Sequence, residues 1–276
     1  MELNELVNVV AAADTELKCP FPHFSEEWPI NKIPPPETVN DADKLSNARK
    51  GDTDRRTELT LDPPIDLGGG KESNVAGFSA HHLIPGNEIW NDKGHPLHAW
   101  AAEKAKGSHV KGDIGYDTNC AGNGLDLPSN KAIDGWSGQN PAVQLEYALA
   151  AMAVDHGKRQ FHDSHKAYSE FVWNVLEKVA AKIANQAGQP CPEKRKNCGG
   201  EGEEKWDPPL GLVGRLHNVA TRLKVHLRGE PTTWQAPVMT SRFAMMFAET
   251  GLSQAEAREK LREARKKMKE MRGTHG

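Results

Sequence analysis

The sequence predicts an α+β protein that is predominantly helical, and three observations support this prediction. Apolar residues recur with helical periodicity over several segments of the 276-residue chain. Two short apolar stretches that stop at a proline have the pattern of β-strands. Proline and glycine are concentrated in the first 70 residues and again at 188–210, where little regular structure is expected.

The two predicted strands lie at 78–85 and 124–128. Each is short, apolar and ended by a proline. Adjacent residues on a strand point to opposite faces, so two neighbouring polar side chains there can have different surroundings.

Seven helices are predicted from apolar spacing and capping signals. The strongest begins at His165 and is followed by Gly188, which supplies its C-terminal stop. The last begins with the capping box Ser253-Gln-Ala-Glu256 and is basic. The predicted helices cover 3–14, 95–106, 141–155, 165–187, 210–227, 236–247 and 253–272.

Composition divides the chain into four parts. Residues 1–70 are predicted to form an N-terminal helix and a Pro- and Gly-rich extended arm, because proline disfavours helix there. Residues 71–187 are the expected folded core, and 188–210 a connector rich in Cys, Pro and Gly. Residues 211–276 are interpreted as a helical extension with a basic terminal helix.

Charge and cysteine content bear on partners and compartment. The formal net charge of −3 combines an acidic front with a basic C-terminal helix, so contact with a polyanion is expected near the C-terminus. No stretch has the roughly 20 apolar residues that a membrane span needs, and the acidic start does not resemble a signal peptide. Cys191 and Cys198 are interpreted as free thiols, with a local disulfide or a zinc half-site as alternatives.

Two groups of histidines have the spacing of a catalytic site. On a strand, His81 can bind a metal ion while His82 faces a substrate as a base. His162 and His165 are three residues apart at the start of the strongest predicted helix, where such positions share a face. Asn123, between the two groups, can fix the tautomer and rotation of the basic imidazole. Phosphodiester hydrolysis uses this combination of a metal ion and a base with a pKa near neutrality.

Three motifs follow one another in an informative order: Ala80-His81-His82-Leu-Ile-Pro85, Tyr116-Asp-Thr-Asn-Cys-Ala-Gly-Asn123-Gly-Leu-Asp-Leu-Pro128, and His162-Asp-Ser-His165 followed by Tyr168. Together they resemble the AHH group of nucleases in the HNH/endonuclease VII superfamily, found mostly as toxin tips of bacterial polymorphic and type VI secretion effectors. The resemblance covers about residues 75–185 and implies a ββα-metal nuclease core with helical additions.

The resemblance implies a role for each motif residue. His81 would ligate the metal, His82 would be the general base, and Asn123 would orient His82 or help to hold the metal. His162 and His165 would complete the metal or phosphate contacts.

Two further points concern the surroundings of these residues. About 39 residues separate Asn123 from His162, which requires an inserted helix near 141–155 and makes His156 a rival to His162. Lys166 and Arg159 flank the histidines and could contact phosphate.

The resemblance implies a metal-dependent, largely sequence-non-specific endonuclease that hydrolyses DNA and acts as an antibacterial secreted toxin. Zn or Ni would suit the histidines, and Mg or Mn would support turnover. Expected partners are a DNA substrate, an acidic cognate immunity protein and a secretion apparatus or delivery module, without membrane insertion. The protein would be made in the bacterial cytoplasm and act in the target-cell cytoplasm. The alternatives are an RNase toxin with the same site and a non-catalytic, secretion-linked binding module with a structural zinc.

Overall fold

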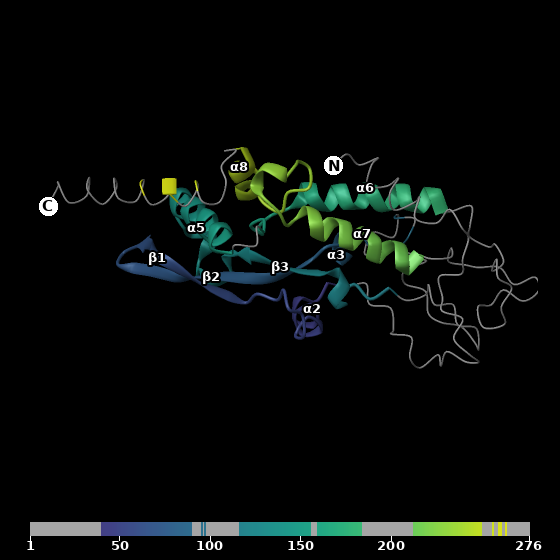
Figure 1. Cartoon of the computed structure of the whole chain (residues 1–276), viewed down its shortest axis with the longest axis horizontal. Helices are drawn as coiled ribbons and strands as arrows, with labels where there is room; N and C mark the ends of the chain where they lie inside the picture. The colour runs from purple at the N-terminus through teal and green to yellow at the C-terminus, as the bar shows by residue number, and fades with distance from the viewer. Residues whose placement is uncertain are drawn as a thin grey trace, which may run out of the picture. The chain divides into compact units, whose positions relative to one another are not determined.

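A computed structural model of the chain describes residues 40–89, 95, 97, 116–155, 159–183 and 212–249, and four positions between 256 and 263. The chain folds as two compact units built from interleaved segments (Figure 1). Among the described residues, the first unit contains those within Met1–Gly51, His82–Gly124 and Ser169–Leu223, and the second contains those within Asp52–His81, Leu125–Tyr168 and Lys224–Gly276.

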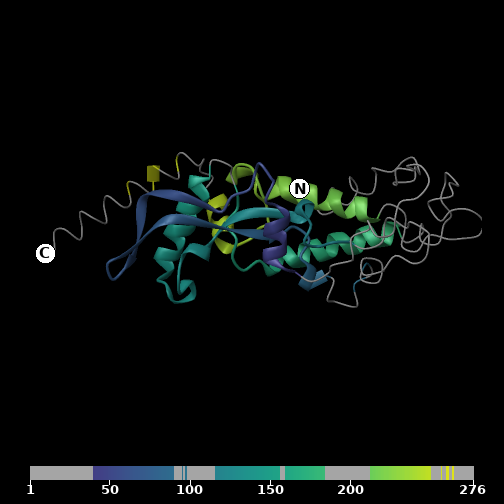
Figure 2. The same ribbon diagram turned by 90° about the horizontal axis from the view of Figure 1, so that it is seen from below.

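The second unit is built on a three-stranded sheet with the order β1–β2–β3, visible from below in Figure 2. The strands are β1 (Glu58–Gly68), β2 (Lys71–His82) and β3 (Gly124–Ser129). β1 and β2 pair antiparallel. Three glycines make the turn between them, with φ angles of 84°, 62° and 78° at Gly68, Gly69 and Gly70. This left-handed region is readily accessible only to glycine.

The strand β1 shows that the predicted N-terminal arm is wrong where the structure describes it. Pairing with β2 is interrupted between Thr60 and Ile65, and Pro63 and Pro64 lie in that interval. Proline cannot donate a ladder hydrogen bond, but it is tolerated on edge strands and at bulges. Because β1 is an edge strand, its prolines are compatible with the sheet.

The first residues that the structure describes also form regular secondary structure. The helix α2 (Ala42–Ala48) in the first unit begins where the Asp41 carboxylate accepts hydrogen bonds from the N–H groups of Asp43 and Lys44, at 3.0 and 2.9 Å. This arrangement is an N-cap, which satisfies donors that a helix start leaves unpaired. Residues 42–48 and 58–68 are therefore folded elements of the two units.

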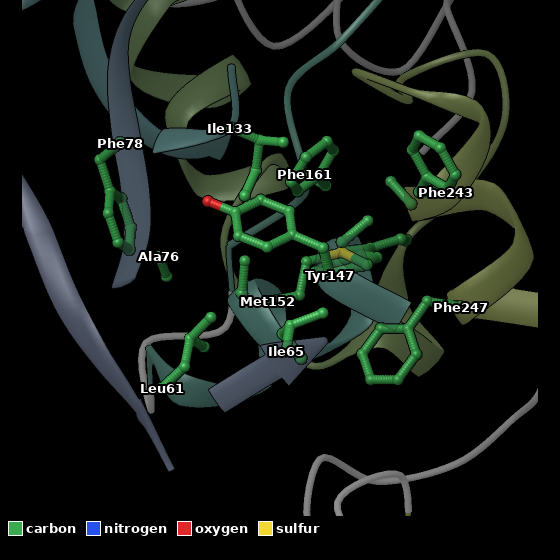
Figure 3. Packing of buried hydrophobic residues seen from close by; sticks show 14 residues of the cluster. Leu61, Ile65, Ala76, Phe78, Ile133, Tyr147, Met152, Phe161, Phe243 and Phe247 are labelled. Atoms are coloured by element: carbon green, nitrogen blue, oxygen red, sulfur yellow. The ribbon is translucent and has the colours of Figure 1, made fainter. Parts of the chain in front are cut away.

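The hydrophobic core of the second unit surrounds Tyr147 on α5 (Pro141–Val154), a helix that the sequence predicts (Figure 3). α5 packs against β1 and against α8 (Arg242–Glu249). The buried Tyr147 hydroxyl accepts a hydrogen bond from the Gly77 N–H at 3.0 Å and donates one to the Ser129 carbonyl at 3.2 Å. The same side chain therefore fills the core and links β2 to the end of β3.

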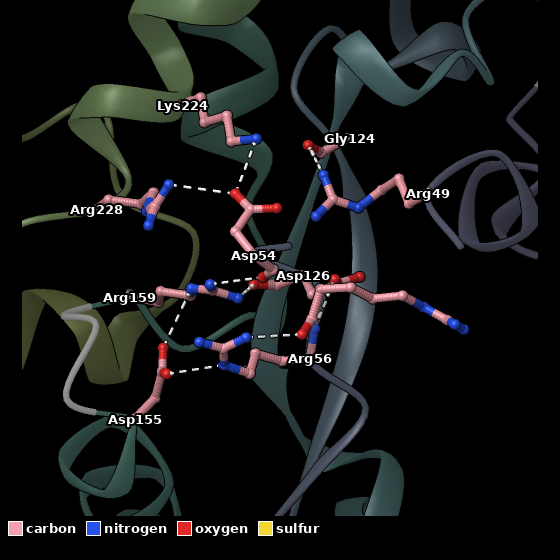
Figure 4. A network of polar contacts seen from close by, with 10 residues as sticks. Arg49, Asp54, Arg56, Gly124, Asp126, Asp155, Arg159, Lys224 and Arg228 are labelled. Atoms are coloured by element: carbon pink, nitrogen blue, oxygen red, sulfur yellow. Dashed lines mark hydrogen bonds and ion pairs between the residues drawn. The ribbon is translucent and has the colours of Figure 1, made fainter. Parts of the chain in front are cut away.

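A network of charges in the second unit centres on the buried side chain of Arg159 (Figure 4). The Arg159 guanidinium lies 3.1 Å from the Asp155 carboxylate and donates to the carbonyl oxygens of Asp126 and Asp54, at 3.0 and 2.8 Å. The Asp54 carboxylate in turn pairs with two basic side chains that follow Leu223, Lys224 at 3.0 Å and Arg228 at 3.2 Å. A buried charge of this kind is tolerated because it is paired and hydrogen-bonded.

The first unit contains most of two amphipathic helices, α6 (Lys166–Ile183) and α7 (Leu212–His226), which run side by side in Figures 1 and 2. Both bury apolar side chains at helical spacing. Within this unit, the buried apolar residues of the two helices are Phe171, Val172, Val175, Leu176, Val179 and Ala180 on α6, and Leu216, Val219, Ala220 and Leu223 on α7.

Most predicted elements are confirmed where the structure describes them. β2 starts earlier than predicted and ends at His82, since 83–85 turn into the short helix α3 (Gly86–Ile89). α8 starts at Arg242 instead of 236, after a 3₁₀ turn at Pro231–Thr233 and Pro237. The described positions within 253–272 are helical. The predicted helix at 3–14, most of 95–106, and Cys191 and Cys198 lie outside the described residues. Among those residues, no helix is long and apolar enough to cross a membrane.

Gly77→Ala should lower the free energy of unfolding by about 1–3 kcal/mol, a typical cost of overpacking. A Cβ at Gly77 would lie 2.8 Å from the backbone nitrogen of Ala132, which cannot move as a side chain can. Gly138→Ala is the matched control, because nothing lies within 4 Å of its Cβ position. Denaturant unfolding followed by circular dichroism measures both, and equal stabilities would contradict the packing argument.

Candidate active site

Three histidine side chains converge in the second unit. One ligand nitrogen from each of His81, His162 and His165 lies within 4.8 Å of the others. The ring centroids are 4.8 to 5.1 Å apart. His81 is 2% exposed, while His162 and His165 are half-buried. These three residues are the histidine cluster, and the structure brings together all three that the sequence predicts as metal ligands.

Different elements hold the members of the cluster. His81 is the second-last residue of β2. His162 forms an isolated parallel bridge with Ser129, and its N–H donates to the Pro128 carbonyl at 2.7 Å, so it lies beside the end of β3. His165 directly precedes α6.

The prediction that one helical face presents His162 and His165 is therefore wrong, because the helix starts only at Lys166. The segment before α6 is not helical, and it is held by the bridge to β3.

Tyr168, in the first turn of α6, packs against two rings of the cluster. Its ring centroid lies 5.1 Å from that of His81 and 5.7 Å from that of His165. Tyr168 is fully buried, and this burial raises its pKa well above the usual value. The phenol therefore stays neutral and limits the rotation of two ligand rings.

The histidine cluster fits a divalent transition metal ion. Imidazole nitrogen suits Zn, Cu, Fe and Ni, and the cluster offers three such nitrogens within 4.8 Å of one another. Catalytic zinc sites commonly have three protein ligands and an open position, whereas structural sites have four protein ligands. Three imidazoles of this kind favour a catalytic site over a closed structural one.

His82, the last residue of β2, is oriented by an asparagine. Its Nε2 lies 2.8 Å from Oδ1 of Asn119, which also accepts a hydrogen bond from the Asp41 N–H at 2.9 Å. An amide oxygen only accepts, so Nε2 must carry the proton. In the neutral ring, Nδ1 then holds the lone pair and can act as a base.

Burial keeps His82 in its neutral form. The pKa of His82 is lowered from its usual value, mainly because burial disfavours the charged imidazolium. The hydrogen bond that His82 donates to Asn119 and the negative charges of Asp41, Glu88 and Asp117 oppose the shift without cancelling it. The ring is therefore ready to accept a proton at neutral pH.

Asn123 does not make the contact with His82 that the sequence predicts. Its Oδ1 accepts from the Ile84 N–H at 2.8 Å, and its Nδ2 donates to the carbonyl oxygens of Ile84 and Thr118 at 3.0 and 2.8 Å. Asn123 therefore holds the loop that follows His82. Asn119 belongs to the same motif. The sequence gives no signal that tells which of these two asparagines contacts His82, because this depends on how the loop folds.

The two predicted phosphate contacts have different surroundings. Lys166 is exposed at the start of α6, next to His165. Arg159 is 1% exposed and its guanidinium contacts Asp155, Asp126 and Asp54. The predicted phosphate contact of Arg159 is therefore wrong, because this side chain stabilises the second unit and is not available to substrate. His156 lies outside the described residues.

Two other described histidines, His95 and His217, pack against aromatic side chains. The ring of His95 packs on Trp173 with centroids 4.8 Å apart, and its Nε2 lies 3.3 Å from the Trp173 carbonyl. His217 lies against Tyr116, with centroids 5.8 Å apart.

Comparison with known proteins finds one family that the central part of the chain resembles. No curated protein and no solved structure matches the chain. Residues 65–190, which contain every site residue above, match the AHH family, a nuclease family of the HNH/ENDO VII superfamily with conserved AHH, and this match confirms the predicted resemblance.

Proposed function

We propose that this protein is a metal-dependent endonuclease that hydrolyses DNA phosphodiester bonds with little sequence preference. The match to a nuclease family implies nuclease activity. The observation that carries the proposal is the histidine cluster, whose member His81 is followed directly by His82, with its proton held on Nε2 by Asn119.

Each residue has a defined part in this reaction. His82 takes a proton at Nδ1 from the water that attacks phosphorus, while Asn119 holds the ring and stabilises the Nε2 proton. His81, His162 and His165 would hold the divalent ion. When bound, that ion supplies positive charge that stabilises the transition state and the departing oxygen. Tyr168 keeps the ligand rings in place.

The lack of sequence preference is proposed from the nature of the site. Phosphate contacts position a nucleic acid without reading its bases, and the residues assigned here act on phosphate and water. RNA contains the same phosphodiester bond and is therefore the competing substrate. It is tested beside plasmid DNA in the experiment described below.

The biological setting is proposed from the resemblance alone. The protein would act as an antibacterial toxin that a secretion apparatus or delivery module carries into the target-cell cytoplasm. A DNA-degrading enzyme would damage the cell that makes it. An acidic cognate immunity protein would therefore bind the enzyme in the producing cell.

Purified protein should degrade plasmid DNA when a divalent ion is added and should stop when a chelator removes it. His82→Ala should lower kcat by about 10²–10⁴-fold, the usual contribution of a general base. His82→Ala should still bind Zn²⁺ or Ni²⁺ in calorimetry, because the cluster does not include it. Total RNA is tested in parallel, and degradation of RNA alone would contradict the proposed substrate. Loss of folding on metal removal with full activity of His82→Ala would support a structural zinc.

Asn119→Ala and Asn123→Ala should have different effects although the residues are close in sequence. Asn119→Ala should lower kcat/KM by about 10–100-fold, as removal of a partner that orients a site histidine does. Asn123→Ala should mainly lower the melting temperature, because three buried backbone groups lose their partner. Kinetics and thermal unfolding of both variants separate the two roles, and interchanged effects would return the orienting role to Asn123.

The pH profile should report the environment of His82. Above its pKa the ring is neutral and active, and below it the protonated ring cannot accept a proton. Because burial lowers this pKa, the acid limb of kcat/KM should fall below pH 6.5. In Asn119→Ala the limb should move further toward acid, since the Asn119 hydrogen bond raises the pKa. A limb above 6.5 in the wild type would contradict the assignment of His82 as the base.

A further inference from the structure

A pair of serine hydroxyls lies beside the histidine cluster and has no part in the mechanism above. The Oγ atoms of Ser79 on β2 and Ser129 on β3 are 2.7 Å apart. Ser129 is 1% exposed, whereas Ser79 is half-buried. The pair is therefore open to solvent on the side of Ser79.

The hydrogen-bond inventory of the pair assigns its donors. The Oγ of Ser129 accepts from the Lys131 N–H at 3.4 Å, and its own proton requires an acceptor because Ser129 is buried. Ser79 Oγ is the acceptor within reach. If Ser129 donates to Ser79, the proton of Ser79 is left to point toward solvent, since one hydroxyl carries a single donor. Ser79 is thus a hydrogen-bond donor whose position is fixed by the hydrogen bond from the buried Ser129 hydroxyl.

Two independent connections place this donor next to the cluster. Ser79 and His81 are two residues apart on β2, so they share a face of the strand. The rise of a strand separates their Cα atoms by about 6.4–6.8 Å. On the neighbouring strand, Ser129 is the bridge partner of His162. Both serines therefore adjoin a residue of the histidine cluster.

We propose that Ser79 donates a hydrogen bond to the phosphate next to the one that is cleaved, and that Ser129 positions it. This inference rests on the proposed function, because it assumes that the cleaved phosphate lies at the histidine cluster. The distance along β2 is similar to the spacing of successive phosphates in one nucleic-acid strand. A hydroxyl that contacts phosphate carries no base information, which agrees with cleavage without sequence preference.

The test compares two substrates. Bis(p-nitrophenyl) phosphate has a single phosphodiester and no neighbouring phosphate, whereas a DNA duplex has both. In Ser79→Ala, the ratio of kcat/KM on DNA to kcat/KM on the small ester should fall about tenfold, the size expected for one hydrogen bond to a charged group. The change should be carried mainly by KM on DNA. Ser79→Thr keeps a hydroxyl on a strand that accepts β-branched residues, so it should restore most of the ratio.

Two further variants test the positioning. Ser129→Ala leaves the donor in place without its support, and it should lower the ratio by a smaller factor in the same direction. Ser73→Ala is the matched control on the same strand, because its hydroxyl donates to the Val75 carbonyl at 3.1 Å and it should leave the ratio unchanged. Calorimetry with Zn²⁺ should give the wild-type affinity for Ser79→Ala.

The outcomes separate this inference from the proposed function. A wild-type protein that degrades DNA while Ser79→Ala keeps the wild-type ratio overturns the inference alone. Equal losses on both substrates also overturn it, since they place Ser79 at the cleaved phosphate or in the fold. A wild-type protein that cleaves neither substrate overturns the proposed function and this inference with it.

Discussion

The backbone contact between His162 and the end of β3 is the constraint on which the candidate metal site depends. The N–H of His162 donates to the Pro128 carbonyl, and the parallel bridge to Ser129 holds the non-helical segment before α6. Gln160 and Asp163, on either side of His162, are both tied to Thr240, at 2.9 and 3.1 Å. A segment fixed in this way brings two histidines to His81 without a helix beneath them, so the ligand spacing does not depend on helical periodicity.

The assigned base depends on a separate set of contacts within the first unit. Asp41 caps α2 with its side chain, and its N–H fixes the orientation of the Asn119 amide. Asn119 then sets the tautomer of His82. The loop after His82 is held by Asn123. The two asparagines of one motif therefore have different roles. Asn119 orients the imidazole of His82, and Asn123 holds the backbone that follows it.

One charged residue near the site in sequence, Arg159, stabilises the fold. Arg159 is three residues from His162, yet its guanidinium is buried against Asp155 and two carbonyl oxygens. Removing such a charge from water is costly unless several partners meet it. The same geometry that makes Arg159 a stable part of the second unit removes it from contact with phosphate. The hydroxyls of Ser79 and Ser129 are smaller and uncharged, and both residues adjoin a residue of the cluster along or across the strands.

The sequence by itself determined the order of the motifs, the helices α5, α6 and α7, the strand at 124–128 and the three cluster histidines. These features depend on local patterns: apolar periodicity, capping residues and the spacing of histidines within short segments. It misjudged β1, because two prolines are read as a loop unless the strand is known to lie at a sheet edge. The choice of Asn119 over Asn123, the burial of Arg159 and the pairing of Ser79 with Ser129 were decided only by the tertiary structure. Each depends on a contact between residues 33 or more positions apart, and no local pattern specifies such a contact.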